Sequence, residues 1–163
     1  MTDTLKSICE RCTYLSNPSL NFIPDEFSPN REIIRRDISQ LLIAASAESD
    51  KAVILLAGSL LEAVLYSFLK SQESFISQRK GGIFTLNLEE GLQYFKATFN
   101  RWFSDLIANA KLPDRIVDYR NLVHIHNELQ STTSTPDVCA LAARELLLTL
   151  NNLLERLTDY AGR

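Results

Sequence analysis

The sequence predicts an all-α protein with about five to six helices, on three observations. Apolar residues recur three and four positions apart through most of the chain, which is the period of an amphipathic helix. No stretch keeps the apolar–polar alternation of a half-buried strand. Five glycines and five prolines are few for 163 residues. The 45% of hydrophobic residues suffices for one domain, residues 1–163, with its core over about residues 30–160.

Two helices are expected near the start of the chain. The first, residues 4–16, has an apolar face formed by Leu5, Ile8, Cys9, Cys12 and Leu15. An ordered loop containing three prolines follows over residues 17–30. The second helix is expected to have Asn30 as its N-cap and to end near Ala47. Its predicted apolar stripe is Ile33, Ile34, Ile38, Leu41, Leu42 and Ala45.

The third predicted helix, Asp50 to about Ser71, is the most hydrophobic part of the chain. Its seventeen-residue run Val53–Leu69 contains one charged residue, Glu62, which favours a buried helix over a membrane span. A buried carboxylate is costly unless it is paired or protonated. Two interpretations of Glu62 follow: contact with Arg120 or a neighbouring polar group, or exposure on a narrow outer stripe.

The second half of the chain predicts further helices. A short one runs from near Asn87 to about Thr98, and the next, residues 100–110, has apolar anchors at Trp102, Phe103, Leu106 and Ile107. Pro113 suits the first turn of a helix over residues 114–126. The last helix is capped by Thr135 and runs from Pro136 to about Tyr160. Its predicted apolar stripe is Val138, Leu141, Ala142, Leu146, Leu150, Leu153, Leu154 and Leu157.

The net charge argues against one class of function, general duplex-DNA binding, and the cysteine content argues against another, metal binding. A net charge of −3 and a pI near 5.4 argue against broad binding of duplex DNA, although they leave room for a small cationic RNA pocket. Cys9 and Cys12 have C-x-x-C spacing but lack a second ligand pair, and Cys139 stands apart. We therefore expect small core cysteines, with no metal and no cofactor.

Two further expectations concern the compartment. Three cysteines, an odd and modest number, fit a reducing cytoplasm. Charges run through the first twenty residues, which lack the apolar segment of a signal peptide. A cytoplasmic protein without a membrane partner is expected.

Chemically distinctive side chains gather in residues 118–126, which hold both histidines. On a helix, Arg120 and His124 lie one turn apart with Asn121 beside them, whereas His126 points about 120° away from Arg120. His126 would join the same pocket through a distorted helix end or through a second subunit.

Such a cluster suits attack on a phosphodiester. Arginine fits phosphate oxygens, and histidine transfers protons near neutrality. Asparagine could orient a ribose hydroxyl or the imidazole ring. The combination indicates RNA cleavage without a metal, using the 2′-hydroxyl as nucleophile. The alternative is structural: Arg120 pairs with a carboxylate, and the histidines are solvated or cap a helix end.

The segment Arg120-Asn121-Leu122-Val123-His124-Ile125-His126 resembles the R-x(4–6)-H motif of HEPN domains, read as Arg120, five residues, then His126. Asparagine directly after the arginine is common in that family. The apolar helix around Leu56–Leu65 and the terminal helix are also similar to HEPN-like proteins. The resemblance in helix order covers about residues 30–160, and its specific part is the seven-residue motif.

The resemblance implies an HEPN-like, up-and-down helical bundle that pairs as a homodimer. Family members include metal-independent endoribonucleases, often toxins or antiphage effectors, whose motifs from two subunits form a shared cleft. Carried over, Arg120 would bind the scissile phosphate, His126 would be the acid/base, and Asn121 would orient substrate or histidine. Asp118 and Glu62 would support them. RNA and a cognate antitoxin or other partner protein are the implied partners.

A second interpretation of the motif uses the other histidine. Many HEPN-like proteins carry an arginine-asparagine pair with a histidine three residues after the asparagine, usually followed by proline. His124 matches that histidine, with Ile125 in place of the proline. If Arg120 and His124 are the relevant pair, the resemblance implies a noncatalytic module that binds RNA or a protein.

Overall fold

A computed structural model describes residues 3–70 and 136–162 of the chain. They form α1 (Leu5–Arg11), α2 (Thr13–Ser16), the 3-10 turn η1 (Asp25–Phe27), α3 (Ser28–Ser46), α4 (Asp50–Lys70) and α10 (Pro136–Ala161), with no strand in these two ranges. The all-α prediction is thus confirmed for this part of the chain. The helices predicted between residues 87 and 126 lie outside the described residues.

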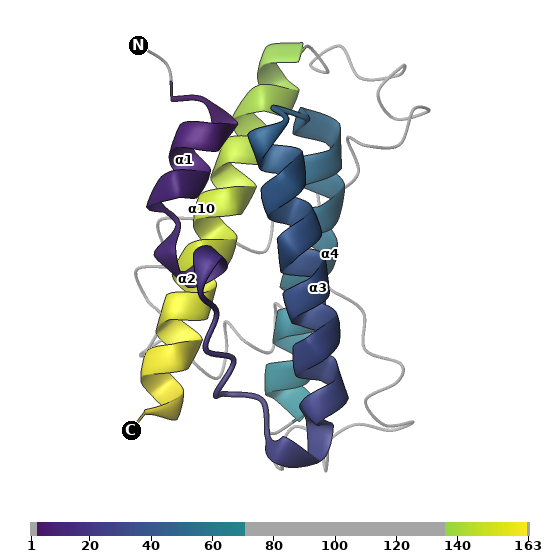
Figure 1. Cartoon of the computed structure of the whole chain (residues 1–163), viewed down its shortest axis with the longest axis vertical. Coiled ribbons are helices and arrows are strands. Elements are labelled where there is room, and N and C mark those ends of the chain that lie inside the picture. Colours follow the sequence, from purple (N-terminus) through teal and green to yellow (C-terminus); the bar gives the residue numbers. More distant parts are fainter. Residues whose placement is uncertain (1–2, 71–135, 163) are drawn as a thin grey trace.

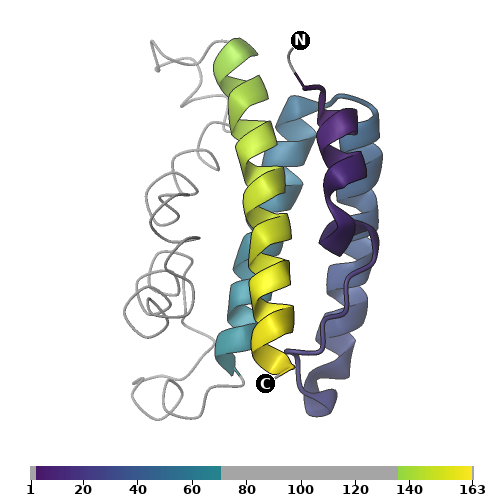
Figure 2. The ribbon, with the colours of Figure 1, turned by 90° about the vertical axis from the view of Figure 1, so that its left-hand side faces the viewer.

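The long helices pack side by side (Figure 1). Helices α3 and α4 are antiparallel and joined by residues 47–49, whereas α4 and α10 lie next to each other and run in the same direction (Figure 2). The short helices α1 and α2 pack against α3 and α10. With α1 and α2 counted as one segment, the four helical segments therefore form a ring in which α4 lies between α3 and α10.

One cluster of buried apolar side chains fills the space between these helices. Phe68 of α4 is its largest member with almost no exposed surface. The Phe68 ring meets Phe22 edge to face at 6.5 Å and Tyr160 at 5.6 Å, measured between ring centroids. These two contacts join the loop before α3, helix α4 and helix α10, and such aromatic pairs add to the free energy gained by burial.

The apolar face predicted for residues 4–16 is confirmed, since all five of its residues are buried. The structure divides this segment at Cys12 into α1 and α2. Helices α4 and α10 agree with prediction to within one residue at each end. On α10, however, Leu141 is 52% exposed, so its assignment to the apolar stripe was wrong.

The start of α3 also differs from prediction. The helix begins at Ser28 with Pro29 in its first turn, so Asn30 is not the N-cap. The Asn30 side chain instead donates to the hydroxyl of the buried Ser67 at 3.5 Å. Ile33 is 49% exposed, because it lies about 100° around the helix from Ile34 and the buried stripe is narrow. That stripe is Ile34, Ile38, Leu41, Ala44 and Ala45.

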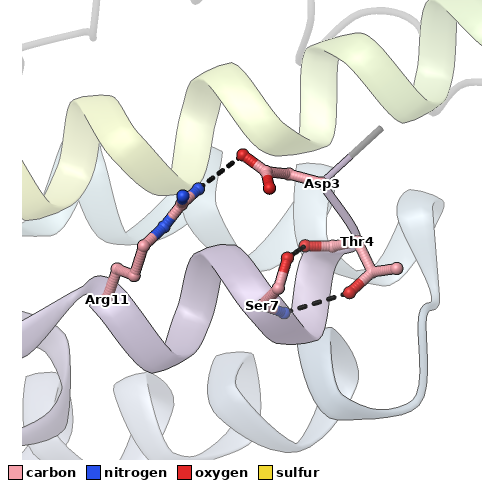
Figure 3. A network of polar contacts seen from close by, with 4 residues as sticks. All are labelled: Asp3, Thr4, Ser7 and Arg11. Carbon is pink, nitrogen blue, oxygen red and sulfur yellow. Dashed lines mark hydrogen bonds and ion pairs between the residues drawn. The ribbon is translucent and has the colours of Figure 1, made fainter. Parts of the chain in front are cut away.

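Helix α1 is capped by two side chains. The Thr4 hydroxyl accepts from the Ser7 amide at 3.1 Å, as Figure 3 shows beside the Arg11–Asp3 ion pair of 2.6 Å. The Glu48 carboxylate accepts from the amides of Leu5 and Lys6, each at 3.0 Å. These bonds satisfy amides that have no partner within the helix.

Glu48 makes these bonds from an unusual backbone position. Its φ of 54° lies in the left-handed region, where a side chain is unfavourable. The Lys6 amide is the main reason that the pKa of Glu48 is lowered, with smaller contributions from Leu5, Thr4 and the charge of Arg144. The strain at Glu48 is therefore offset by the contacts of its carboxylate.

Helix α2 is capped from a distant part of the chain. The Asn151 side-chain oxygen, on α10, accepts from the amides of Tyr14 at 3.0 Å and Leu15 at 3.3 Å. Its N-cap residue, Cys12, makes no side-chain cap bond. The position of α2 therefore depends on α10.

The loop before α3 is ordered, as predicted. Leu20, Phe22 and Ile23 are buried in the core. Arg31 donates from Nε to the carbonyl of Ile23 at 2.9 Å and pairs with Asp25 at 2.9 Å. One guanidinium thus ties the end of this loop to the first turns of α3.

Residues Asp50–Phe68 of α4 are long and apolar enough to cross a bilayer by length and composition, with a mean hydropathy of 1.6. No other helix among the described residues meets this criterion. Of this window, 56% is buried inside the protein. A single helix of this kind is weak evidence for a membrane span, because core helices share its composition.

We expect replacement of Glu48 to separate its hydrogen bonds from its backbone strain. Glu48→Ala loses both cap bonds and keeps the strain, so the free energy of unfolding should fall by about 1–2 kcal/mol. Glu48→Gly loses the same bonds but relieves the strain, and should be roughly 1 kcal/mol more stable than Glu48→Ala. Urea unfolding measures both. Equal stability of the two variants would contradict strain at this position.

The Glu48 contribution should also depend on pH. Because folding lowers the pKa of Glu48, its stabilising effect is fully present above the ordinary value of 4.5 and is lost as pH falls through the lower folded value. The stability difference between wild type and Glu48→Ala should therefore shrink in that acidic range.

Removing the Asn151 oxygen should weaken the contact between α2 and α10. Asn151→Ala removes the side-chain partner of the Tyr14 amide and leaves the Leu15 amide with its bond to the Cys12 carbonyl, which should lower the free energy of unfolding by about 1–2 kcal/mol. The exposed amide Gln40 on the outer side of α3 provides a control, and Gln40→Ala should change stability by less than about 0.5 kcal/mol. Similar values for the two variants in thermal or urea unfolding would argue against the cap.

Candidate functional site

The predicted catalytic cluster of residues 118–126 falls between the two described ranges of the chain. The predicted site residues outside the described ranges are Asp118, Arg120, Asn121, His124 and His126. The supporting residue Glu62 is described, and its surroundings on α4 are the part of the predicted site that has a known geometry. The proposed contact between Glu62 and Arg120 stays a prediction.

Glu62 lies on the outer side of α4. The residues of this stripe recur every three or four positions, so they share one side of the helix: they are Lys51, Leu55, Ser59, Glu62 and Tyr66. The first three are exposed, while Glu62 and Tyr66 are half-buried. Glu62 therefore lies on the side of α4 opposite the helix's buried residues.

The neighbouring helix α10 presents a second outer stripe. Its members include Leu141, Glu145, Leu148, Asn152 and Arg156. Because α4 and α10 are adjacent and parallel (Figure 2), these two stripes border the side of the pair that faces away from α1 and α3. We call this surface the α4–α10 face. It combines carboxylates and an arginine with exposed leucines.

The cysteines belong to the core, as predicted. Cys9, Cys12 and Cys139 are buried free thiols. Burial raises the pKa of Cys12 to about 11, and burial together with the charge of Glu10 raises the pKa of Cys9. The thiolate, which is the form that attacks and binds metals, is therefore scarce at neutral pH. Within the described ranges, no group of three or more His, Cys, Asp or Glu residues could hold a metal ion.

Sequence reasoning did not single out Arg144. It sits half-buried on α10, and its charge contributes to lowering the pKa of Glu48. Its Nε atom is buried and has no hydrogen-bond partner within the described part of the chain. The available signal was a charged residue between the apolar runs of the last helix. Its electrostatic influence on Glu48 could not be inferred from spacing.

Comparisons with protein-family models, curated proteins and solved structures find no match for this chain. The likeness to HEPN domains consequently depends on the residues of the motif and on the order of the helices.

The buried thiols should react slowly in the native protein. Because burial raises the pKa of Cys12 to about 11, a thiol reagent at pH 8 should label native protein far more slowly than unfolded protein, in which all three cysteines are accessible. Labelling followed by mass spectrometry assigns each site. Fast modification of Cys9 or Cys12 in folded protein would show that these residues are not confined to the core.

Proposed function

We propose that the protein is a metal-independent endoribonuclease of the HEPN type that acts as a homodimer in the cytoplasm. The observation that carries the proposal is the sequence Arg120-Asn121-Leu122-Val123-His124-Ile125-His126, which combines a phosphate-binding group with a proton-transfer group. The helical character of the described residues and the order of the long helices are compatible with it. An up-and-down, HEPN-like bundle is part of the same proposal.

The proposed reaction needs no metal. The ribose 2′-hydroxyl loses its proton and attacks the adjacent phosphorus, the bond to the 5′-oxygen breaks, and that oxygen receives a proton. The products are a 2′,3′-cyclic phosphate and a 5′-hydroxyl. Arg120 neutralises charge on the phosphate oxygens, and His126 transfers protons. Asn121 orients the substrate or the imidazole.

Two copies of the motif would supply the groups that one copy lacks. On a regular helix, His126 points about 120° away from Arg120, so a single subunit does not bring both side chains to one point. A two-fold axis beside the motif would place Arg120 of one subunit near His126 of the other. Dimerisation is therefore a requirement of the chemistry in this proposal.

The acidic net charge limits any recognition of RNA to a confined pocket. The whole chain has a net charge of −3, so its average field repels polyanions. Binding would depend on a few arginines near the motif and would bury a short stretch of single-stranded RNA. If the protein is a toxin, a cognate antitoxin would act by covering this pocket.

The decisive assay measures RNA cleavage in EDTA. Wild-type protein should cut single-stranded RNA to products with 2′,3′-cyclic phosphate ends, and Arg120→Ala or His126→Ala should reduce the rate by at least about 100-fold. His124→Ala distinguishes the two histidines, because retained activity in this variant assigns proton transfer to His126. Cleavage by both Arg120→Ala and His126→Ala, or none by wild type on varied RNAs, would refute the proposal.

A noncatalytic interaction module is the second candidate. His124 matches the histidine that many HEPN-like proteins carry three residues after the arginine-asparagine pair, although Ile125 replaces the proline that usually follows it. Ile33 and Ile43 are also exposed on α3, the latter by 64%. Exposed apolar residues favour a protein partner, although scattered ones are common. Such a module would bind RNA or protein without cutting, and Arg120→Ala would change its affinity or stability only.

A further inference from the structure

Helix α4 has more apolar surface than the described helices cover. Within the described part of the chain, it packs mainly against α3 and α10. Its remaining side carries two charged residues, Lys51 and Glu62, and otherwise mostly small and apolar residues: Ala52, Leu55, Leu56, Ser59, Ala63 and Tyr66. Leu55 is 52% exposed. A helix with apolar residues well beyond its packed side normally has protein covering that further surface.

The outer side of α3 provides the contrast. Its exposed residues are mostly polar or charged: Glu32, Arg35, Arg36, Ser39 and Gln40. Ile33 and Ile43 are the large apolar exceptions. This composition is that of a helix with one side in solvent. The outer surface that needs to be covered by further protein is therefore that of α4 and α10, and not that of α3.

We infer that the α4–α10 face is the docking surface for residues 71–135 of the same chain. Helix α4 ends and α10 begins at opposite ends of the structure (Figure 1). The 21 residues of α4 span roughly 30 Å. The connection must therefore cover this length to join Lys70 to Pro136.

The length of the connection fits this course. Residues 71–135 comprise 65 residues, and a single helix covering roughly 30 Å needs about 20. The surplus is enough for more than one helix along the face. The most direct route between the two ends runs beside α4 and α10, the helices that the connection joins.

The sequence of the connection supplies apolar residues that require burial. Trp102, Phe103, Leu106 and Ile107 recur at helical spacing, and aromatic residues of this size bury large areas. On the docking surface, Leu55 of α4 and Leu141 and Leu148 of α10 offer apolar contacts. If a second copy of the chain covered the α4–α10 face instead, the apolar residues of the connection could not be buried against it.

The docking also determines what surrounds Glu62. Because Glu62 lies on the α4–α10 face, a connection that packs there encloses its carboxylate between α4 and a segment containing seven arginine and lysine residues. Pairing with one of them would offset the cost of burial. The docking itself does not depend on the proposed ribonuclease activity.

Photocrosslinking of the full chain identifies the occupant directly. A benzoylphenylalanine placed at Ser59, in the middle of the exposed stripe, should form an intrachain crosslink to a tryptic peptide from residues 71–135. The same probe at Ile43, on the outer side of α3, should give no crosslink to that segment. Covalent dimers from Ser59 would assign the face to a second copy and overturn the inference, as would the absence of any crosslink.

A pair of aspartate substitutions gives an independent readout. Leu55→Asp should lower the thermal midpoint by about 2–4 °C and raise the rate of tryptic cleavage within residues 71–135 by about tenfold. Ile43→Asp, the control at an even more exposed isoleucine, should change neither. Equal behaviour of the two variants would contradict the docking. If Leu55→Asp fails to fold while Ile43→Asp folds, that difference also supports a covered Leu55.

Discussion

Helix α4 holds the described structure together because it contacts both long neighbours at once. Its inner side packs against α3 and α10, and its last turns bring Phe68 to the rings of Phe22 and Tyr160. Burying one side chain of this size contributes about 1.5–3 kcal/mol. The positions of α3 and α10 relative to each other depend on it.

The short helices depend on this frame in a different way. Helices α1 and α2 have 7 and 4 residues, well below the length at which an isolated helix is stable in water. Their first amides are satisfied by Glu48 from the α3–α4 turn and by Asn151 from α10. The amino-terminal segment therefore gains its conformation from long-range contacts, together with burial of Leu5, Ile8 and Leu15.

Local signals in the sequence predicted the long helices well. A proline suited to the first helical turn, Pro136, and the continuous apolar run after Asp50 predicted the starts of α10 and α4, because such start signals and periodicity are properties of neighbouring residues. The same reasoning failed at Asn30, Ile33 and Leu141. A run of adjacent apolar residues does not reveal which of them faces the core, since that depends on where the neighbouring helix lies.

Long-range polar contacts were beyond prediction from one sequence. Glu48 and Leu5 are separated by 43 residues, and Asn151 and Tyr14 by 137, so no spacing rule connects them. For the candidate site, the sequence identified residue types suited to phosphodiester chemistry. It also identified Glu62 as an unusual charge in an apolar helix. It could not say whether Arg120 lies near that charge, because such a contact depends on tertiary packing.

The two sides of α4 connect the fold to the proposed chemistry. The inner side is fixed by the core, so the outer stripe that carries Glu62 is held on a rigid helix. A site assembled over this stripe would have one fixed wall, and preorganised groups on rigid elements orient substrates better than groups on loops. An arginine held by Glu62 would have fewer conformations open to it and would lose less entropy when it binds a phosphate. The same contact would partly neutralise its charge, so the benefit of Glu62 to catalysis depends on orientation outweighing that loss. If orientation outweighs the loss of charge, Glu62 supports catalysis; if it does not, an ion pair between Glu62 and the arginine is purely structural.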